Sequence, residues 1–406
     1  MSMIELVSPD ICTACGACAS ICPKHAIHFT EDPDGFAVPV IDETNCISCG
    51  RCIKVCPLNH TAELKNSGST AKVYAAFSKD GKLVRESSSG GIFSVLAGHV
   101  IDMGGAVYGA AFDETFTVRH IGVETKEDLA KLRGSKYVQS AIAEDLFAVI
   151  QNQLEQDRKV LFSGTPCQVA GLKSFLGRDY PGLLLVDLIC HGVPAPKVFA
   201  AYLEAMKQKY GQELTGYSFR DKKKGWKRYN IRLTYRDKEQ CLWQWQDPYM
   251  KLYSHITQPF LRASCYQCRF MTPERVSDIT IGDFWGYTPT ATMPDKDTGI
   301  SCILCNTAKG NSFYSECLPC LQSEKRDLSE LKHHALHHNM AFEPVAREKF
   351  RTIFHRSGFS AAAAIFRVPR KKIVRNFMLL YFPGIMKFLS FVKRMIFRML
   401  FLRGRT

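Results

Sequence analysis

The first sixty residues or so contain the same cysteine run twice. The run C-x2-C-x2-C-x3-C-P begins at Cys12 and returns 34 residues later at Cys46. Thiolates are soft ligands that suit iron, and three closely spaced thiolates can bind three corners of one cube, while the fourth cysteine of each run ligates the other cluster. The pattern therefore predicts two [4Fe–4S] clusters. One would take Cys12, Cys15, Cys18 and Cys56, and the other Cys22, Cys46, Cys49 and Cys52.

Zinc is the alternative to iron at these cysteines. A zinc site needs about four ligands, usually in simple pairs. The duplicated run, with Pro23 and Pro57 turning the chain away after each fourth cysteine, favours iron. The N-terminus has neither the basic start nor the long apolar run of a secretory signal peptide, so we expect a cytoplasmic protein. In that compartment, closely spaced cysteines indicate metal or redox sites rather than disulfides.

The chain of 406 residues is long enough for two or three domains. Residues 1–62 read as a ferredoxin-like dicluster domain with a hairpin turn at Asp34-Gly35. From residue 63 to 344, strand patterns such as AVYGAAF (106–112) and LLLVDLIC (183–190) alternate with helical ones, which indicates an α/β domain. We therefore expect an α+β protein in which the dicluster domain precedes an α/β domain and a basic helical tail at 345–406; the resemblance described below implies that the α/β domain binds a flavin.

The positive charge of the chain belongs to this tail. Residues 345–406 hold 15 Lys and Arg against one Glu, which equals the net charge of +14 of the whole chain. The remainder is neutral, and we expect no nucleic-acid partner. The apolar stretches after Phe377 are interrupted by Lys and Arg, so they fail the length test for a membrane span and fit an amphipathic helix on an anionic membrane surface. A partly disordered tail, or one that docks on a protein, is the alternative.

Four further cysteines are candidates for a third [4Fe–4S] cluster. Cys167 and Cys190 follow predicted strands, where α/β folds place ligands, and Cys265 and Cys268 form a C-x2-C pair. A nucleophilic Cys167, or four buried cysteines without metal, are the alternatives. We interpret Cys241, Cys302, Cys305, Cys317 and Cys320 as structural, with Cys302 and Cys305 on opposite faces of a strand. The histidines at 333, 334, 337 and 338 could bind zinc, but a solvated helix face is favoured.

Small-residue loops precede helices or strands at several points. SSSGG (87–91), GGAVYG (104–109) and GSKY (134–137) could bring backbone N–H groups close to phosphates, with Arg133 and Lys136 as countercharges. None of these loops is a dinucleotide fingerprint or a Walker loop. On the pattern alone, a simple turn is favoured for each.

Taken together, the motifs resemble a known family. SSSGGIFSVLA, GGAVYGAAF, LRGSKYVQS, VLFSGTPCQVAGL, VDLICHGVP, FRDKKKGWK, the CYQC pair and SDITIGDFWG are similar to the beta subunits of coenzyme F420-reducing hydrogenases and F420-linked dehydrogenases. The resemblance covers residues 1–320 or so. It implies FAD and a third [4Fe–4S] cluster on Cys167, Cys190, Cys265 and Cys268. It also implies that the loops line the FAD through Ser88, Ser89, Gly90, Gly91, Arg133, Gly134, Ser135, Lys136, Tyr137, Gly164, Thr165 and Pro166.

The resemblance implies an iron–sulfur flavoprotein oxidoreductase. Ferredoxin or another redox protein would exchange single electrons with the clusters, and FAD would exchange a hydride with an organic acceptor or donor, in either direction. Lys136 and Asp283 are candidates for contacts to cofactor or substrate, and Asp187 and His191 for proton handling; capping of strand-end loops is the alternative for both aspartates. A subunit without its own substrate and a membrane-surface adaptor with structural or sensory clusters are the alternative functions.

Overall fold

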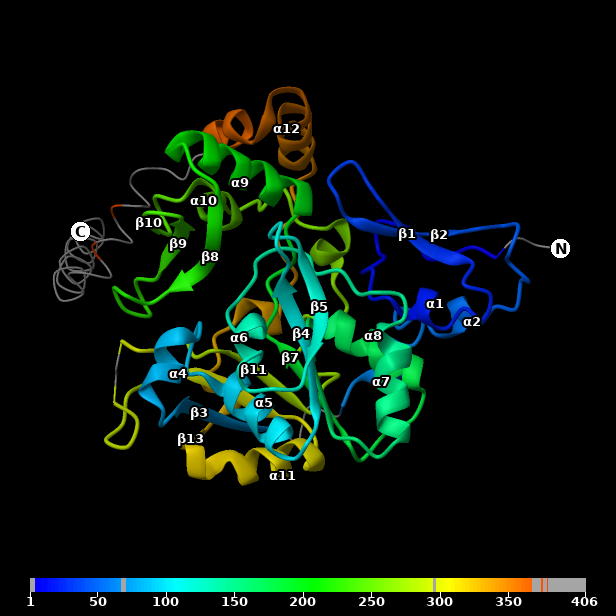
Figure 1. The fold of residues 1–406 in the computed structure, drawn as a ribbon, viewed down its shortest axis with the longest axis horizontal. Helices are drawn as coiled ribbons and strands as arrows, with labels where there is room; N and C mark the ends of the chain where they lie inside the picture. Colours follow the sequence, from blue (N-terminus) through cyan, green and yellow to red (C-terminus); the bar gives the residue numbers. More distant parts are fainter. Residues whose placement is uncertain (1–3, 67–70, 295–296, 367–373, 375–377, 379–406) are drawn as a thin grey trace, which may run out of the picture.

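The computed structural model describes residues 4–66, 71–294, 297–366, 374 and 378. A large sheet lies at the centre, with the N-terminal domain beside one of its faces and a smaller lobe beyond its edge (Figure 1). This α+β arrangement confirms the predicted fold class. Within the described residues, no helix combines the length and the apolar character that crossing a bilayer requires. The predicted amphipathic segment after Phe377 lies outside the described residues, apart from Met378.

The N-terminal domain repeats its structure as well as its sequence. Helix α1 (Ala17–Ser20) and helix α2 (Arg51–Lys54) are 34 residues apart, and each follows a glycine in the left-handed region, Gly16 or Gly50. Strands β1 (Ile27–Glu31) and β2 (Ala37–Ile41) form an antiparallel pair between them. Gly35, with φ of 86°, supplies the positive φ that the predicted hairpin turn needs. Helix α3 (Thr61–Leu64) ends the domain.

The large sheet has the order β13-β3-β12-β11-β7-β6-β4-β5. Its four central neighbours run parallel, namely β4 (Ala106–Phe112), β6 (Val160–Gly164), β7 (Leu183–Leu188) and β11 (Ile279–Asp283). Antiparallel strands complete it: β3 (Lys72–Ser78), β5 (Val118–Val123), β12 (Ser301–Cys305) and β13 (Leu321–Arg326). The carboxyl ends of parallel strands share one edge, so Gly164, Leu188 and Asp283 lie at the same edge of the sheet.

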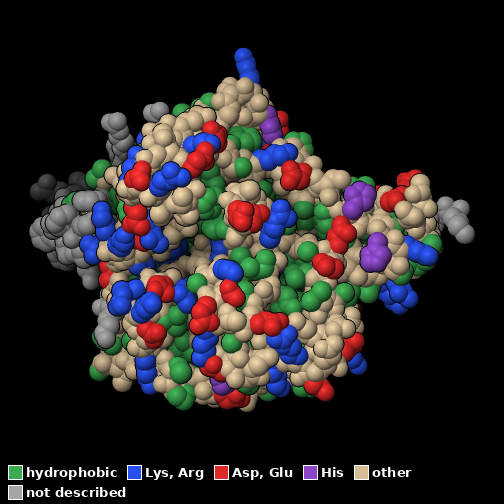
Figure 2. All heavy atoms as spheres, viewed as in Figure 1, with side chains coloured by type: hydrophobic (Ala, Val, Ile, Leu, Met, Phe, Trp, Pro, Cys, Tyr) green, Lys and Arg blue, Asp and Glu red, His purple; other side chains and the backbone are tan. Residues whose placement is uncertain are grey.

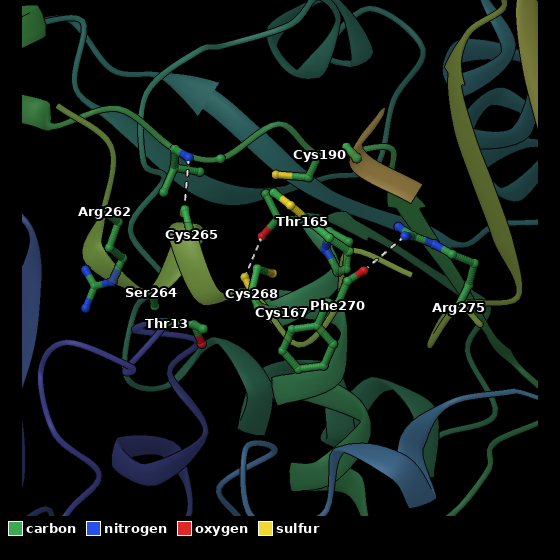
Figure 3. A pocket seen from close by; sticks show the side chains of 15 residues that line it. Thr13, Thr165, Cys167, Cys190, Arg262, Ser264, Cys265, Cys268, Phe270 and Arg275 are labelled. Carbon is green, nitrogen blue, oxygen red and sulfur yellow. Dashed lines mark hydrogen bonds between the residues drawn. The ribbon is translucent and has the colours of Figure 1, made fainter. Parts of the chain in front are cut away.

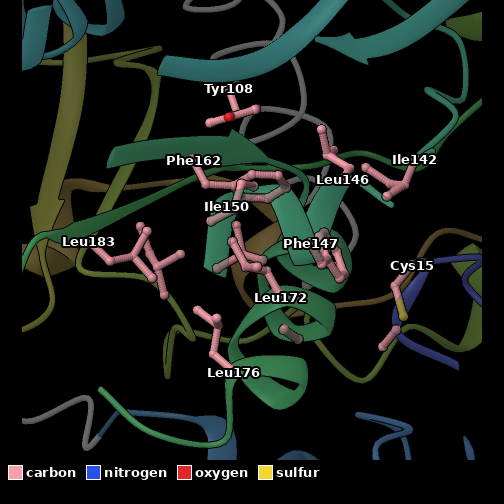
Figure 4. Close-up of a cluster of buried hydrophobic side chains, with 14 of the residues drawn as sticks. Cys15, Tyr108, Ile142, Leu146, Phe147, Ile150, Phe162, Leu172, Leu176 and Leu183 are labelled. Carbon is pink, nitrogen blue, oxygen red and sulfur yellow. The ribbon is translucent and has the colours of Figure 1, made fainter. Parts of the chain in front are cut away.

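The two faces of the sheet are covered by different helices. On β6, Leu161 packs with α5 (Ile92–Asp102) and α11 (Ala308–Cys317), whereas Phe162 packs with α7 (Leu146–Glu155) and α8 (Pro166–Leu176). Short helices α4 (Gly81–Glu86) and α6 (Leu129–Leu132) flank α5. The core under α7 and α8 also takes in Cys15 and Ala17, so the N-terminal domain packs on this face (Figure 4).

The smaller lobe is built on aromatic packing. It has a three-stranded antiparallel sheet of β8 (Leu214–Asp221), β9 (Asn230–Tyr235) and β10 (Glu239–Trp243), with α9 (Pro196–Tyr210) and α10 (Pro248–Tyr253). Helix α12 (Pro344–Ile365) buries Phe350, Phe354 and Phe359 in the same core as α9. The predicted tail starts at 345, inside α12, and its described part therefore packs against the body of the molecule.

Cysteines and histidines outside the candidate sites differ in part from expectation. Cys302 and Cys305 are buried in different cores, which confirms that they face opposite sides of β12. Cys320 is exposed, not buried as expected, because it ends a 3-10 turn at the surface. The predicted histidine helix is one 3-10 turn (His334–Leu336). His333 is buried, against the expected solvated face, because its ring bonds the backbone oxygen of Asp283 at 2.5 Å.

Candidate functional site

Two cavities in the N-terminal domain are lined by cysteines from both halves of the repeat. We call these two cavities, with the cysteines that line them, site 1 and site 2. The cavity at site 1 is lined by Cys12, Cys15, Cys18 and Cys56, and Cys52 also reaches it. The cavity at site 2 is lined by Cys22, Cys46, Cys49 and Cys52. Each cavity thus draws its fourth cysteine from the other run, as the crosswise prediction requires.

The donor chemistry of sites 1 and 2 suits an iron–sulfur cluster. Burial, together with repulsion from the neighbouring thiolates of Cys12 and Cys56, raises the pKa of Cys18 to about 12. Burial likewise raises the pKa of Cys15 well above its ordinary value. Such thiols become stable thiolates only beside a strongly positive group, and cluster iron is such a group. Site 2 lies nearer to solvent, since Cys49 is exposed and Ile47 is 57% exposed.

The other four predicted ligands also meet around one cavity, which we call site 3 (Cys167, Cys190, Cys265 and Cys268). Cys167 lies in the first turn of α8 and Cys190 follows β7, so both come from the carboxyl edge of the sheet. Cys265 is in the 3-10 helix Ala263–Gln267, and Cys268 follows that helix. Figure 3 shows the sulfur atoms turned toward one another. The fold therefore brings together cysteines that are up to 101 positions apart in the sequence.

Local contacts orient the sulfurs of site 3. The backbone N–H of Val193 donates to Sγ of Cys265 at 3.4 Å, and Oγ1 of Thr165 lies 3.1 Å from Sγ of Cys167. Burial raises the pKa of Cys265 to about 12 and that of Cys167 to about 11, and neighbouring cysteines of the set add to both shifts. The same donor chemistry as at site 1 is present, so the residues fit a third cluster.

Sites 1 and 3 are adjacent. Thr13 lines both cavities. On α8, Gly171 lies four residues after Cys167, about 6 Å along the helix axis. A Cβ added at Gly171 would lie 2.9 Å from Sγ of Cys15, so only glycine lets this ligand of site 1 lie against α8. One turn of α8 therefore separates Cys167 of site 3 from Gly171, which lies against Cys15 of site 1.

Two buried arginines, which sequence reasoning missed, line site 3 on opposite sides (Figure 3). Arg275 donates to Oδ2 of Asp187 at 3.0 Å and to the backbone oxygen of Leu188. Arg262 donates to the backbone oxygen of Cys12 at 2.7 Å. Their only sequence signal is that both flank the C-x2-C pair. Asp187 is thus a buried partner of Arg275, and burial raises its pKa while the arginine charge opposes that shift.

The predicted flavin loops converge at Ser88, near the same sheet edge. The backbone N–H of Ser135 donates to Oγ of Ser88 at 2.8 Å, and Arg220 donates to the backbone oxygen of Ser88 at 3.3 Å. A Cβ at Gly90 would lie 2.5 Å from the backbone oxygen of Ala76, so this turn excludes side chains. Helix α5 begins after Gly91 without a side-chain cap. Gly164 and Thr165 precede α8 instead and Pro166 begins it, and Thr165 and Pro166 line site 3.

An ion pair joins the smaller lobe to the sheet edge beside Ser88. Arg220 donates to both carboxylate oxygens of Asp283, at 2.8 and 3.2 Å, and to the Tyr137 hydroxyl at 3.1 Å. Trp226 donates to Asp283 at 2.8 Å and stacks on Trp285, with 4.4 Å between ring centroids. Burial works to raise the pKa of Asp283, but the Arg220 charge holds it below the ordinary value. Sequence reasoning missed Arg220 and Trp226, although both lie in the quoted motif FRDKKKGWK.

The two predicted countercharges already have protein partners. Arg133 bonds Glu86 at 2.5 Å and Ser94 at 3.1 Å. Nζ of Lys136 donates to three backbone oxygens at the end of α6 (Leu132, Arg133 and Gly134), and burial lowers its pKa to about 7. A second lysine, Lys222, donates to the backbone oxygen of Ser89 at 2.6 Å. Figure 2 shows Lys and Arg side chains around a hollow between the smaller lobe and the large sheet.

His191 follows Cys190 of site 3 and lies near Asp283, the partner of Arg220 and Trp226. Its ring centroid is 6.1 Å from that of His333, which is bonded to the backbone of Asp283. Burial lowers the pKa of His191 to about 4, and the neighbouring His333 adds to this shift. A neutral imidazole can both accept and donate a proton. In the described part of the chain, no group of three or more His, Cys, Asp or Glu side chains is arranged to bind a single metal ion.

These features define a redox protein that carries iron–sulfur clusters, and comparison with known proteins gives its family. Residues 11–60 match a 4Fe-4S dicluster domain, which confirms the prediction of a two-cluster domain. Residues 73–146 and 157–330 match the N-terminal and C-terminal parts of the coenzyme F420 hydrogenase/dehydrogenase beta subunit. The chain belongs to this family and is an iron–sulfur electron-transfer subunit of the F420 hydrogenase type.

Comparison with solved structures gives a more distant likeness. The chain is similar to a chain of the F420-reducing [NiFe] hydrogenase complex from Methanosarcina barkeri, known from a xenon-derivatization structure, with 16% identity and a TM-score of 0.44. The likeness covers 74% of this chain and 91% of that one. No curated protein matches the chain.

Proposed function

We propose that the chain is an iron–sulfur flavoprotein oxidoreductase with clusters at sites 1, 2 and 3 and an FAD beside Ser88. FAD would supply the exchange between single electrons and a hydride, which passes to or from an organic partner such as coenzyme F420 or a related molecule. The observation that carries the proposal is the continuity of the sites. Sites 1 and 3 share Thr13, and site 3 lies at the sheet edge where the Ser88 loops converge.

The residues of each site have distinct roles in this proposal. The cysteines bind the clusters. The turn at 88–91, the uncapped start of α5 and the nearby Lys222 suit the diphosphate of a dinucleotide, because N–H groups at a helix start and cations both favour negative charge. Arg220 and Asp283 fix the smaller lobe against this turn. Lys136 and Asp283 remain our candidates for cofactor or substrate contacts, and Asp187 and His191 for proton handling.

We propose site 2 as the entry point for electrons from ferredoxin or another redox protein. Its Cys49 is exposed, and the exposed Ile47 and Ile53 lie beside it in sequence. A partner can therefore approach this site more closely than the buried ligands of site 1. This favours a cytoplasmic protein that works with other redox proteins. We propose separately that residues 367–406 hold the protein to an anionic membrane surface. This proposal rests on their charge alone.

The test is the composition of protein purified without air. We expect about twelve irons, from three four-iron clusters, and one FAD per chain, and the absorbance of both groups should bleach on reduction. About eight irons without flavin would defeat the proposal and leave the dicluster domain. Turnover of a small substrate without further subunits would separate an enzyme from a pure electron-transfer subunit. Binding to anionic liposomes that survives removal of 367–406 would defeat the membrane proposal.

A further inference from the structure

Arg262 makes an unusual bridge between the two domains. Its side chain is 3% exposed and donates three hydrogen bonds: to the backbone oxygen of Cys12 at 2.7 Å, to Oε1 of Gln139 at 3.0 Å and to the backbone oxygen of Ala37 at 2.9 Å. Cys12 is a ligand of site 1, and Arg262 itself lines site 3. One guanidinium therefore contacts the chain of one proposed cluster while lining the cavity of the next.

The surroundings of Arg262 repeat this link. Its backbone N–H donates to Val193, whose own N–H donates to Sγ of Cys265. Gln139 bonds Arg262, donates to the backbone oxygen of Thr13 at 3.5 Å, and bonds the backbone oxygen of Pro194 through its own N–H. Thr13 is the residue shared by the two cavities. The network therefore fixes the segment 12–13 against the segment 193–194 of site 3.

The charge of Arg262 is balanced differently from that of Arg275. Arg275 is equally buried, but its charge is balanced by an ion pair with Asp187 at 3.0 Å. The three partners of Arg262 are neutral carbonyl and amide oxygens. On its other side Arg262 lines an outer groove with Asp34, whose carboxylate is engaged by Arg351 at 3.0 Å and His355 at 2.9 Å. A guanidinium is always protonated in proteins, so Arg262 brings a positive charge to site 3.

We propose that Arg262 is a positioning residue that holds the Cys12 segment against site 3 and whose charge raises the reduction potential of the cluster there. The inference rests on the proposed third cluster. Gaining an electron makes a cluster more negative, and a cation in a poorly solvated site stabilises that state more than it would in water.

The experiment is a redox titration of the full chain, followed by electron paramagnetic resonance, for the wild type, Arg262→Gln and Arg262→Lys. We expect Arg262→Gln to keep its iron and to have a lower reduction potential at site 3. At a fixed potential, the reduced-to-oxidised ratio of this cluster should fall at least tenfold, which corresponds to a shift of about 59 mV for one electron. Arg262→Lys keeps the charge and should restore most of the potential. Arg269→Gln is the matched control, because Arg269 also follows a cysteine of site 3 and bonds the N-terminal domain, at the backbone oxygen of Leu58, but it is exposed and solvent screens its charge.

Hydrogen exchange of the same variants gives a second readout. Lysine cannot reproduce the planar fork that bonds Cys12, Gln139 and Ala37 together. We therefore expect faster amide exchange at residues 12–14 in both Arg262 variants and unchanged exchange there in Arg269→Gln. This readout decides the matter if Arg262→Gln fails to hold iron or to fold.

The outcomes separate the two proposals. A wild type without a third cluster signal would defeat the proposed function, and this inference with it. If the wild type holds three clusters but Arg262→Gln changes the reduced-to-oxidised ratio of site 3 less than twofold at a fixed potential, the inference alone is defeated. Unchanged exchange at residues 12–14 in Arg262→Lys would also defeat it.

Discussion

The N-terminal domain and site 3 present the same four-cysteine chemistry in opposite ways. In the N-terminal domain, all eight ligands lie within 45 residues, and a repeat of 34 residues places them. At site 3 the cysteines proposed as ligands come from α8, from just after β7 and from the 3-10 helix Ala263–Gln267 and the residue that follows it, and only the fold brings them together. The comparison shows that local spacing can encode a metal site directly, whereas a site at a sheet edge depends on the whole domain.

The largest effect should come from exchanging a ligand that crosses the repeat. We expect Cys56→Ser to empty site 1, although its sequence neighbours Cys46, Cys49 and Cys52 belong to site 2. About four of about twelve irons should be lost, and the signal lost should match that of Cys12→Ser. Iron analysis and electron paramagnetic resonance measure this. If Cys56→Ser instead reproduced the loss seen in Cys46→Ser, the crosswise arrangement would be wrong.

A ligand exchange at site 3 tests the other half of the comparison. Cys190→Ser should also remove about four irons but leave the two signals of the N-terminal domain intact, because its cysteines form a separate set. Cys241→Ser, in strand β10, is the matched control and should keep all iron. Equal iron content in both variants, measured without air, would show that site 3 holds no cluster.

A single added methyl group can strain the contact between Cys15 of site 1 and Gly171 of α8, the helix that also carries Cys167 of site 3. Gly171→Ala would place its Cβ 2.8 Å from Cβ of Cys15, and we expect a loss of about 1–3 kcal/mol in the free energy of unfolding. Gly98→Ala, also inside a helix, meets only the end of Lys126 at 4.0 Å and should stabilise by up to about 1 kcal/mol. Urea unfolding measures both. Stabilisation by Gly171→Ala would contradict the close packing of site 1 on α8.

The smallest effect concerns pH and belongs to the second domain. In the folded chain the pKa of Lys136 lies near 7, whereas an unfolded lysine keeps its proton to about 10.5. Between these values the unfolded state binds more protons, so stability should rise with pH, by at most about 1.4 kcal/mol per pH unit. Lys136→Met should flatten this rise, as measured by urea unfolding at pH 7 and pH 9. Lys131→Met, at an exposed lysine, should keep the rise; an equal rise in both variants would refute the assignment.

Sequence reasoning succeeded where neighbours in sequence are neighbours in space. The dicluster domain, its hairpin and most strands could be predicted because their signals are local: cysteine spacing, Asp34-Gly35, and runs such as 106–112. Arg220 and Arg262 could not be selected, because their partners Asp283 and Cys12 lie 63 and 250 residues away. Charge sets residues 345–406 apart as a tail, but Phe350 and Phe354 place helix α12, where this tail begins, in a core that the sequence alone does not reveal.

The bare Cα of Gly171 has a consequence for speed. Electron tunnelling between metal centres weakens exponentially with their separation, so the rate depends most on the closest approach that the protein permits. At this approach the polypeptide offers one helical turn and no side chain. With the proposed cluster at site 3, Gly171 would set how closely sites 1 and 3 approach, and a larger side chain there would press on Cys15, move the two sites apart and slow the transfer.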